Sequence, residues 1–260
     1  MAEHISVSVE GRVLTVRMER KEKKNALTRG MYLGLIEALR QAEGDAGVRV
    51  VLITGAEDCF TAGNDLVDFA NARPEETKPG ERSPAIAYLY ALAEAQKPVM
   101  AAVGGVAVGI GTTMLLHCDV VYAASTARFQ LPFVNLGLCP EGGSSVILPG
   151  LVGQQRAAEL LFFGEPFDAD TACRLGIVNE VLAADQLMAK AHARAQQLAE
   201  KPPSALRTTK TLLKHASAQA IADAMARETQ EFAALLQGPE AKEAMSAFME
   251  RRKPDFSKLG

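Results

Sequence analysis

Apolar and polar residues follow two different periods along the first part of the chain. Over residues 5–19 they alternate on both sides of a Glu-Gly pair, which predicts a β-hairpin. Thr28 then precedes apolar residues spaced four apart between positions 31 and 39, and this pattern predicts a helix capped by the threonine hydroxyl. The apolar run over residues 48–55 has the length of a buried strand and ends in glycine. A loop is expected after it, over residues 56–66.

The middle of the chain continues with alternating helix and strand patterns. Residues 71–84 are polar and rich in proline, so we expect a mobile surface loop there, one that could serve as a lid. A helical pattern over 85–97 is followed by an apolar strand at 98–103 and a glycine-rich turn at 104–111. Helices that alternate with apolar strands predict an α/β fold.

The last part of the chain changes from a mixed pattern to helices alone. Residues 112–118 are expected to be helical, and short strands are expected at 119–124, 127–131 and 177–181. Every segment beyond position 201 has a helical, alanine-rich pattern. We therefore divide the chain into a core, residues 1–201, and a helical region, residues 202–260.

Composition and charge exclude several classes of protein. With 48% hydrophobic residues, 23% charged residues and a net charge of −3, the chain has no electrostatic preference for nucleic acid or an anionic membrane. No apolar run approaches the ~20 residues of a membrane span, and the N-terminus lacks the apolar core of a signal peptide. The cysteines and histidines are spaced singly, so we expect a cytoplasmic protein with reduced thiols and no metal site.

One glutamate lies in an unusual place, in the segment PEGGSS, between a proline and two glycines. Proline suits the first position of a helix, and a carboxylate near a helix N-terminus is stabilised by the helix dipole. Glycines beside a carboxylate also allow another molecule to approach closely. Glu141 is therefore either a capping residue or a catalytic residue, and these residues alone favour capping.

Two glycine-containing turns, TAGND and VGIG, each end where a helix is expected to begin. Neither has the G-x-G-x-x-G spacing of a dinucleotide site, so nucleotide binding is not predicted. Small residues at such turns would also suit close packing of a helix on a sheet. A third interpretation is that each turn presents a backbone N–H group, and two such donors that converge would form an oxyanion hole.

The chain is similar to the enoyl-CoA hydratase/isomerase, or crotonase, superfamily over nearly its whole length. The motifs of that superfamily occur here in order: Asn25-Ala26-Leu27, CFTAGNDL at 59–66, the segment 98–132, NLGLCPEGGSS at 135–145, and GEPFDADTACRLGIVNEV at 164–181. The resemblance implies a ClpP-like spiral of ββα units and a C-terminal helical region that packs into trimers, often paired into hexamers. It also implies an acyl-CoA thioester substrate and no separate cofactor, because coenzyme A is part of the substrate.

The resemblance assigns the oxyanion hole to the backbone N–H groups of Asn64 and Ile110. It also assigns contacts with the acyl-CoA to a further set of positions: Lys24, Ala26, Leu27, Ala62, Gly63, Asp65, Leu66, Gly109, Phe133 and Leu136. Two of these have an equally simple structural interpretation. Lys24 belongs to a mixed-charge run that is typical of a solvated loop. Asp65 can cap a helix, which is the role we favour for its side chain.

The carboxylates separate the members of this superfamily. Its hydratases have one glutamate where this chain has Thr113 and a second where it has Phe133, whereas Glu141 matches the single catalytic glutamate of the Δ3,Δ2-enoyl-CoA isomerases. We therefore predict an isomerase of fatty-acid β-oxidation with Glu141 as the proton shuttle. One alternative is a hydratase or another crotonase-type reaction on a specialised CoA ester. The other is a non-catalytic acyl-CoA binding scaffold, in which Glu141 only caps a helix.

Overall fold

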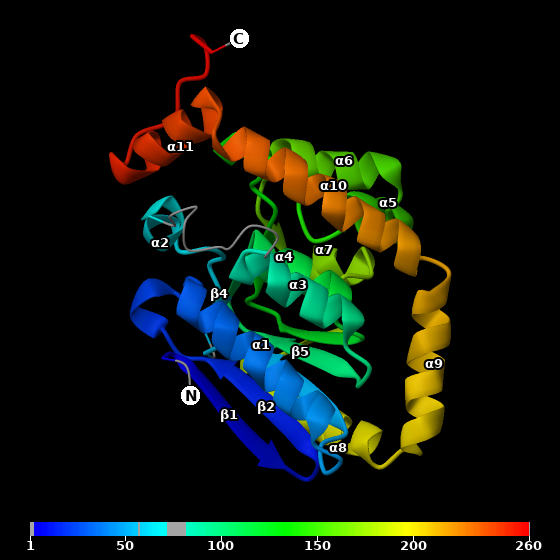
Figure 1. The fold of residues 1–260 in the computed structure, drawn as a ribbon. Coiled ribbons are helices and arrows are strands. Elements are labelled where there is room, and N and C mark those ends of the chain that lie inside the picture. The colour runs from blue at the N-terminus through cyan, green and yellow to red at the C-terminus, as the bar shows by residue number, and fades with distance from the viewer. Residues whose placement is uncertain (1–2, 57, 72–81, 260) are drawn as a thin grey trace.

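A six-stranded sheet forms the centre of the computed structural model, which describes residues 3–56, 58–71 and 82–259 (Figure 1). Its strands lie in the order β1–β2–β3–β5–β7–β10. They are β1 (Ile5–Glu10), β2 (Val13–Met18), β3 (Val50–Thr54), β5 (Val99–Val103), β7 (Val120–Ala124) and β10 (Glu180–Leu182). The predicted hairpin is confirmed, since β1 and β2 pair antiparallel with Glu10 opposite Val13. All the other pairs in this sheet are parallel.

A second sheet of four short strands lies beside the first. Its strands, in spatial order, are β4 (Cys59–Thr61), β6 (Val106–Val108), β8 (Arg128–Gln130) and β9 (Phe167–Asp168). The first three are parallel and β9 is antiparallel. Three of them correct the sequence prediction, because β4 lies in the expected loop, β6 in the expected glycine-rich turn, and β9 where no strand was expected. Strands of three residues are too short for a period of two to be visible in the sequence.

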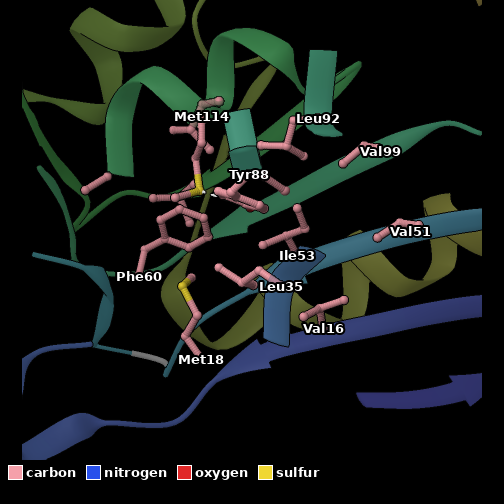
Figure 2. Close-up of a cluster of buried hydrophobic side chains, with 14 of the residues drawn as sticks. Val16, Met18, Leu35, Val51, Ile53, Phe60, Tyr88, Leu92, Val99 and Met114 are labelled. Atoms are coloured by element: carbon pink, nitrogen blue, oxygen red, sulfur yellow. Dashed lines mark hydrogen bonds between the residues drawn. The ribbon is translucent and has the colours of Figure 1, made fainter. Parts of the chain in front are cut away.

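Helices cover both faces of the larger sheet, which explains the continuous apolar runs of its inner strands. Alternate residues of β3 face opposite sides: Val51 and Ile53 pack with the helices on one face, and Val50 and Leu52 pack with the helix on the other. The first face is covered by α1 (Arg29–Gly44) and α3 (Pro84–Glu94), and the second by α8 (Leu187–Ala199). Figure 2 shows the side chains of the first cluster.

A local signal in the sequence explains where α1 begins. The Thr28 hydroxyl accepts a hydrogen bond from the Met31 N–H group at 3.3 Å, so the predicted cap of α1 is confirmed.

The remaining α-helices are α2 (Leu66–Asn71), α4 (Ile110–Thr113), α5 (Ser144–Val152), α6 (Gln154–Phe163), α7 (Ala169–Arg174), α9 (Pro203–His215), α10 (Ala218–Leu236) and α11 (Pro239–Met249). Short 3-10 turns occur at Lys21–Lys23, Met114–His117, Val134–Leu136 and Ala184–Gln186.

Several predicted boundaries move in the structure. The helix expected to reach residue 97 ends at Glu94, before Pro98. The last strand lies at Glu180–Leu182 rather than at 177–181. Most of the predicted lid, residues 72–81, lies outside the described residues. Within the described ranges, no helix is long and apolar enough to cross a membrane.

The C-terminal helices pack against the outside of the core. In Figure 1, α9 runs along one side of the molecule and α10 crosses beside α5 and α6. The Lys210 ammonium of α9 is buried, and it donates to the Lys97 carbonyl and to the Asp119 carboxylate, both at 2.7 Å. Asp119 also accepts from the Val99 N–H group at 2.8 Å. This network attaches α9 to the strand ends of the central sheet.

Substitution of Lys210 by methionine is expected to destabilise the protein by roughly 2–3 kcal/mol. The change leaves Asp119 without its cation, and the loss stays below that of a fully buried pair because the Asp119 side chain is 25% exposed. Urea unfolding measures this loss, with Lys201→Met as the matched control at an exposed lysine. Equal stability of the two variants would contradict the anchoring role.

Candidate active site

Glu141 lies in a turn that leads into α5, and its side chain is buried with 5% exposure. The helix begins only at Ser144, after Gly142 and Gly143 in left-handed conformations, so the Pro-Glu pair does not start a helix. The Thr113 hydroxyl, at the end of α4, donates a hydrogen bond to the Glu141 carboxylate. The carboxylate is therefore bonded to the end of α4, the helix that follows the second turn, rather than to α5.

The N-terminus of α5 is capped by a different glutamate, Glu228 of α10. One of its carboxylate oxygens accepts from the Gly143 N–H group at 2.5 Å, and the other accepts from the Ser145 N–H group at 2.9 Å. The capping interpretation of Glu141 is therefore wrong for its side chain. The sequence could not indicate this, because Glu228 is 87 residues away along the chain.

Two further contacts fix the turn that carries Glu141. The His117 Nε2 atom lies 2.7 Å from the Gly142 carbonyl oxygen. Burial lowers the pKa of His117 to about 4, so the ring is neutral at physiological pH, and its Nε2–H group donates to that carbonyl. The Ser144 hydroxyl donates to the Glu141 carbonyl at 2.6 Å. With these contacts the carboxylate has one preferred direction.

Burial raises the pKa of Glu141 to about 7. The hydrogen bond from Thr113 opposes this shift by stabilising the carboxylate, and the negative charge of Glu228 adds to it. A carboxyl group with a pKa near neutrality is present in both protonation states at physiological pH. It can accept a proton and return it without a large energy cost in either direction.

The two strand-to-helix turns meet because β4 and β6 are parallel neighbours. Thr61 of β4 pairs with Ala107 of β6, and three residues beyond each lie Asn64 and Ile110. The backbones touch there: a methyl group added to Gly63, which has φ +88°, would lie 2.6 Å from the Val108 carbonyl oxygen. The parallel register thus brings the two predicted hole donors to the same edge of the sheet.

The hydrogen bonds around Asn64 turn its backbone N–H group toward the second turn. The Leu27 N–H group donates to the Gly63 carbonyl at 2.7 Å, and the Asp65 N–H group donates to the Leu27 carbonyl at 2.9 Å. In this parallel bridge the pairing uses the groups on either side of Asn64, so its own N–H group points away from Leu27, to the side of β6.

The N–H group of Ile110 is available for a different reason. Ile110 is the first residue of α4, where an N–H group has no acceptor within the helix. Across the described part of the chain, neither this group nor that of Asn64 donates a hydrogen bond to a protein atom. Two uncommitted donors on touching turns are what an oxyanion hole requires.

The other predicted contact residues lie around these turns, with different local roles. The Asp65 carboxylate accepts from the Val67 and Asp68 N–H groups at 3.0 Å and from Arg20 at 2.6 Å, so its predicted capping role is confirmed. The Lys24 side chain is exposed, and the Lys24 carbonyl accepts from the Ala62 N–H group at 2.9 Å. Asp65 and Lys24 therefore both lie beside the first turn.

Phe133 and Leu136 lie on the segment that leads to Glu141. Phe133 is buried in a hydrophobic cluster with residues of α5 and α6, and Leu136 packs against the same cluster. The structure therefore gives both side chains a packing role, and their contact with an acyl group stays a prediction.

Sequence reasoning assigned no individual role to three residues that bond to the segments of this site. Asn25 is fully buried with φ +52°, and its side-chain amide donates to the Cys59 carbonyl at 2.9 Å and the Phe60 carbonyl at 3.1 Å. It thereby attaches the Lys24 segment to β4. Tyr32 donates from its hydroxyl to the Asn64 side chain, and Glu228 caps α5. For Tyr32 the sequence signal is a tyrosine on the apolar face of a helix, because a buried hydroxyl usually finds a hydrogen-bond partner.

The match to known proteins is strong at the level of the family. The enoyl-CoA hydratase/isomerase family model matches residues 8–258, and the chain therefore belongs to this family. A crystal structure of an enoyl-CoA hydratase/isomerase from Pseudoalteromonas atlantica T6c has a TM-score of 0.91 and 40% identity. The match covers 98% of this chain and all of that one. The α/β fold is accordingly the crotonase fold.

Curated relatives carry names from both branches of the family. The 2,3-dehydroadipyl-CoA hydratase of Escherichia coli K12 is 34% identical over 96% of this chain and 97% of its own length. The enoyl-CoA delta isomerase 2 of Rattus norvegicus is 35% identical over 81% of this chain. That match spans only 54% of the rat protein. Hydratases and isomerases are thus similar to this chain to the same degree.

We expect Glu141→Gln to be more stable than the wild type, by an amount that grows with pH. The pKa is raised from 4.5 to about 7 on folding, so the folded protein holds a proton that the unfolded chain has already lost between these values. The wild type therefore loses stability as pH rises through this window. The difference reaches roughly 3 kcal/mol above pH 7 and vanishes below pH 4.5.

Thermal or urea unfolding of both proteins between pH 4.5 and 8.5 measures this difference. Glu159→Gln is the matched control, since Glu159 is an exposed glutamate on α6, and it should show no such trend. A constant offset across the pH range would contradict a buried, neutral Glu141 in the folded protein.

Proposed function

We propose that this chain is an acyl-CoA isomerase that moves the double bond of a 3-enoyl-CoA to the 2-enoyl position. The observation that carries the proposal is a buried carboxylate, Glu141, that accepts a hydrogen bond from the last residue of α4, the helix whose first residue supplies the Ile110 N–H group. An oxyanion hole and one proton carrier are the complete set of groups that this reaction needs.

The reaction balances with those groups alone. The Glu141 carboxylate removes a proton from C2 of the acyl chain, and the electron pair moves onto the thioester oxygen. The N–H groups of Asn64 and Ile110 stabilise the resulting dienolate. The same proton then returns from Glu141 to C4 as the oxygen's electron pair moves back, which leaves the double bond between C2 and C3. No water, metal ion or second acid enters the sequence.

The contacts of Glu141 favour this reaction over hydration. Adding water across a double bond requires groups that activate water and deliver a proton. The family resemblance places hydratase glutamates at the positions of Thr113 and Phe133, and here Thr113 instead donates to Glu141 while Phe133 is buried among apolar side chains. A second carboxylate whose charge acts on Glu141, that of Glu228, has both oxygens bonded to the N-terminus of α5.

The same capping bonds argue against a non-catalytic scaffold. Because Glu228 caps α5, the helix does not require a carboxylate at position 141. A buried glutamate with a raised pKa costs stability that a glutamine would not. A role in chemistry, rather than in folding, therefore accounts for a carboxylate at position 141.

The proposal includes fatty-acid β-oxidation as its setting and an assembly of several copies. The exposed Lys24 is bonded to the first turn through its carbonyl, and a lysine there would attract the CoA phosphates. Large apolar side chains are exposed on the outer helices, among them Leu212 at 69% and Leu213 at 78% on α9, and Phe248 at 57% on α11. The exposure of these side chains supports the predicted trimer or hexamer, in which they would be buried between subunits.

Glu141→Gln is expected to lower kcat for 3-enoyl-CoA by about 10²–10⁴-fold and to leave CoA affinity unchanged. Glutamine cannot accept the C2 proton, and loss of a positioned base typically removes ~10²–10⁴ in rate. The wild type and the variant are given 3-enoyl-CoA and 2-enoyl-CoA in parallel, and the formation of the conjugated thioester is followed. Glu159→Gln serves as the control.

The outcome separates the three candidate functions. Water addition to the 2-enoyl ester would replace the isomerase proposal with a hydratase. Binding of both esters without turnover by the wild type would leave a scaffold as the better description.

The kcat/KM of the isomerisation is expected to rise with pH and to level off above about pH 7. Only the ionised form of Glu141 accepts the C2 proton, and its pKa is about 7. Glu228→Gln should move the profile to lower pH, because it removes the negative charge that helps to raise this pKa. A profile that is flat between pH 5.5 and 8.5 would show that Glu141 does not set the rate.

A further inference from the structure

Tyr32 is a buried tyrosine whose hydroxyl reaches the first strand-to-helix turn. It lies on α1 with 3% of its surface exposed, and its hydroxyl donates to the Asn64 Oδ1 atom at 2.5 Å. A phenylalanine would fill the same space in the core. The hydroxyl is therefore the part of this side chain that calls for an explanation, and its partner is the residue with the proposed hole donor.

The bond from Tyr32 completes the restraints on Asn64. The Leu27 N–H group holds the peptide before Asn64, and the Leu27 carbonyl holds the peptide after it. The side chain of Asn64 projects from the same Cα atom, and Tyr32 holds its end. With the peptides on both sides and the side chain restrained, the Asn64 N–H group keeps a single direction.

Tyr32 also lies within electrostatic reach of the proton carrier. Burial is the main reason why the pKa of Tyr32 is well above its usual value, and the negative charge of Glu141 raises it further. The neutral hydroxyl thus lies near the base, and it contacts the side chain of Asn64, the residue that carries the proposed hole donor.

We propose that Tyr32 is a positioning residue of the oxyanion hole, which directs the Asn64 backbone N–H group by holding the Asn64 side chain. This inference rests on the proposed function, because it concerns the same hole. A hydrogen-bond donor held in one direction stabilises the thioester oxygen most when that oxygen carries its full negative charge, as in the enolate. Tyr32 should therefore affect the enolate more than the bound ground state.

The neighbouring Tyr88 provides a matched control. It is fully buried, its ring centroid lies 6.0 Å from that of Tyr32, and its hydroxyl contacts the Met114 sulfur instead of the hole (Figure 2). Tyr32→Phe and Tyr88→Phe each remove one buried hydroxyl from the same core. A loss that is merely structural would appear in both variants.

The test measures binding of acetoacetyl-CoA, whose enolate carries the same negative oxygen as the reaction intermediate and is followed by its ultraviolet absorbance. Tyr32→Phe should weaken enolate binding, and lower kcat, by roughly tenfold, the scale of one hydrogen bond. Its affinity for free CoA, which lacks the thioester carbonyl, should stay unchanged, as should all properties of Tyr88→Phe. Equal effects in the two variants would overturn the inference.

A double-mutant cycle tests whether Tyr32 acts through Asn64. Asn64→Ala keeps the backbone N–H group but removes the side chain that Tyr32 holds, so Tyr32→Phe should cause little further loss in that background. Losses that multiply would show that Tyr32 acts by another route. Failure of the wild type to bind the enolate would instead contradict the oxyanion hole itself, which separates failure of the proposed function from failure of this inference.

Discussion

The parallel pairing of β4 and β6 is the constraint on which the site depends. It places two turns at one edge of the smaller sheet, so that their backbones touch at Gly63 and Val108. Helix α4 begins directly after the second turn, and the first turn is bonded to Leu27 on its other side. With the neighbouring groups committed, the N–H groups of Asn64 and Ile110 remain as donors. The donors themselves belong to the backbone, and the contact of Tyr32 with the Asn64 side chain is proposed to orient one of them.

The surroundings of Glu141, the proposed proton carrier, are built at that edge by segments far apart in the sequence. Thr113 of α4, His117 just after it and Glu228 of α10 all bond to the short turn at 141–145. The C-terminal helices therefore contribute to the site and not only to the outer surface. A change in the packing of α10 would act on Glu141 through the cap of α5, without any contact with substrate.

The position of Glu141 illustrates a conflict between stability and chemistry. Burial disfavours its charge, which weakens folding near neutral pH, and the same burial brings its pKa to about 7, where proton exchange is easy in both directions. The hydrogen bond from Thr113 limits the shift. A larger shift would leave too little carboxylate to act as a base, and a smaller one would make return of the proton slow.

The sequence by itself determined the long elements and the family. Periodicity located β1, β2, α1 and the inner strands, and the order of five motifs indicated the family and the residues Asn64, Ile110 and Glu141. Only the tertiary structure decided that Glu228, and not Glu141, caps α5, because Glu228 reaches the turn across 85 residues of chain. It also revealed β4, β6 and the contact of Tyr32 with Asn64. Three-residue strands and single long-range hydrogen bonds have no period, so they become visible only when distant segments pack together.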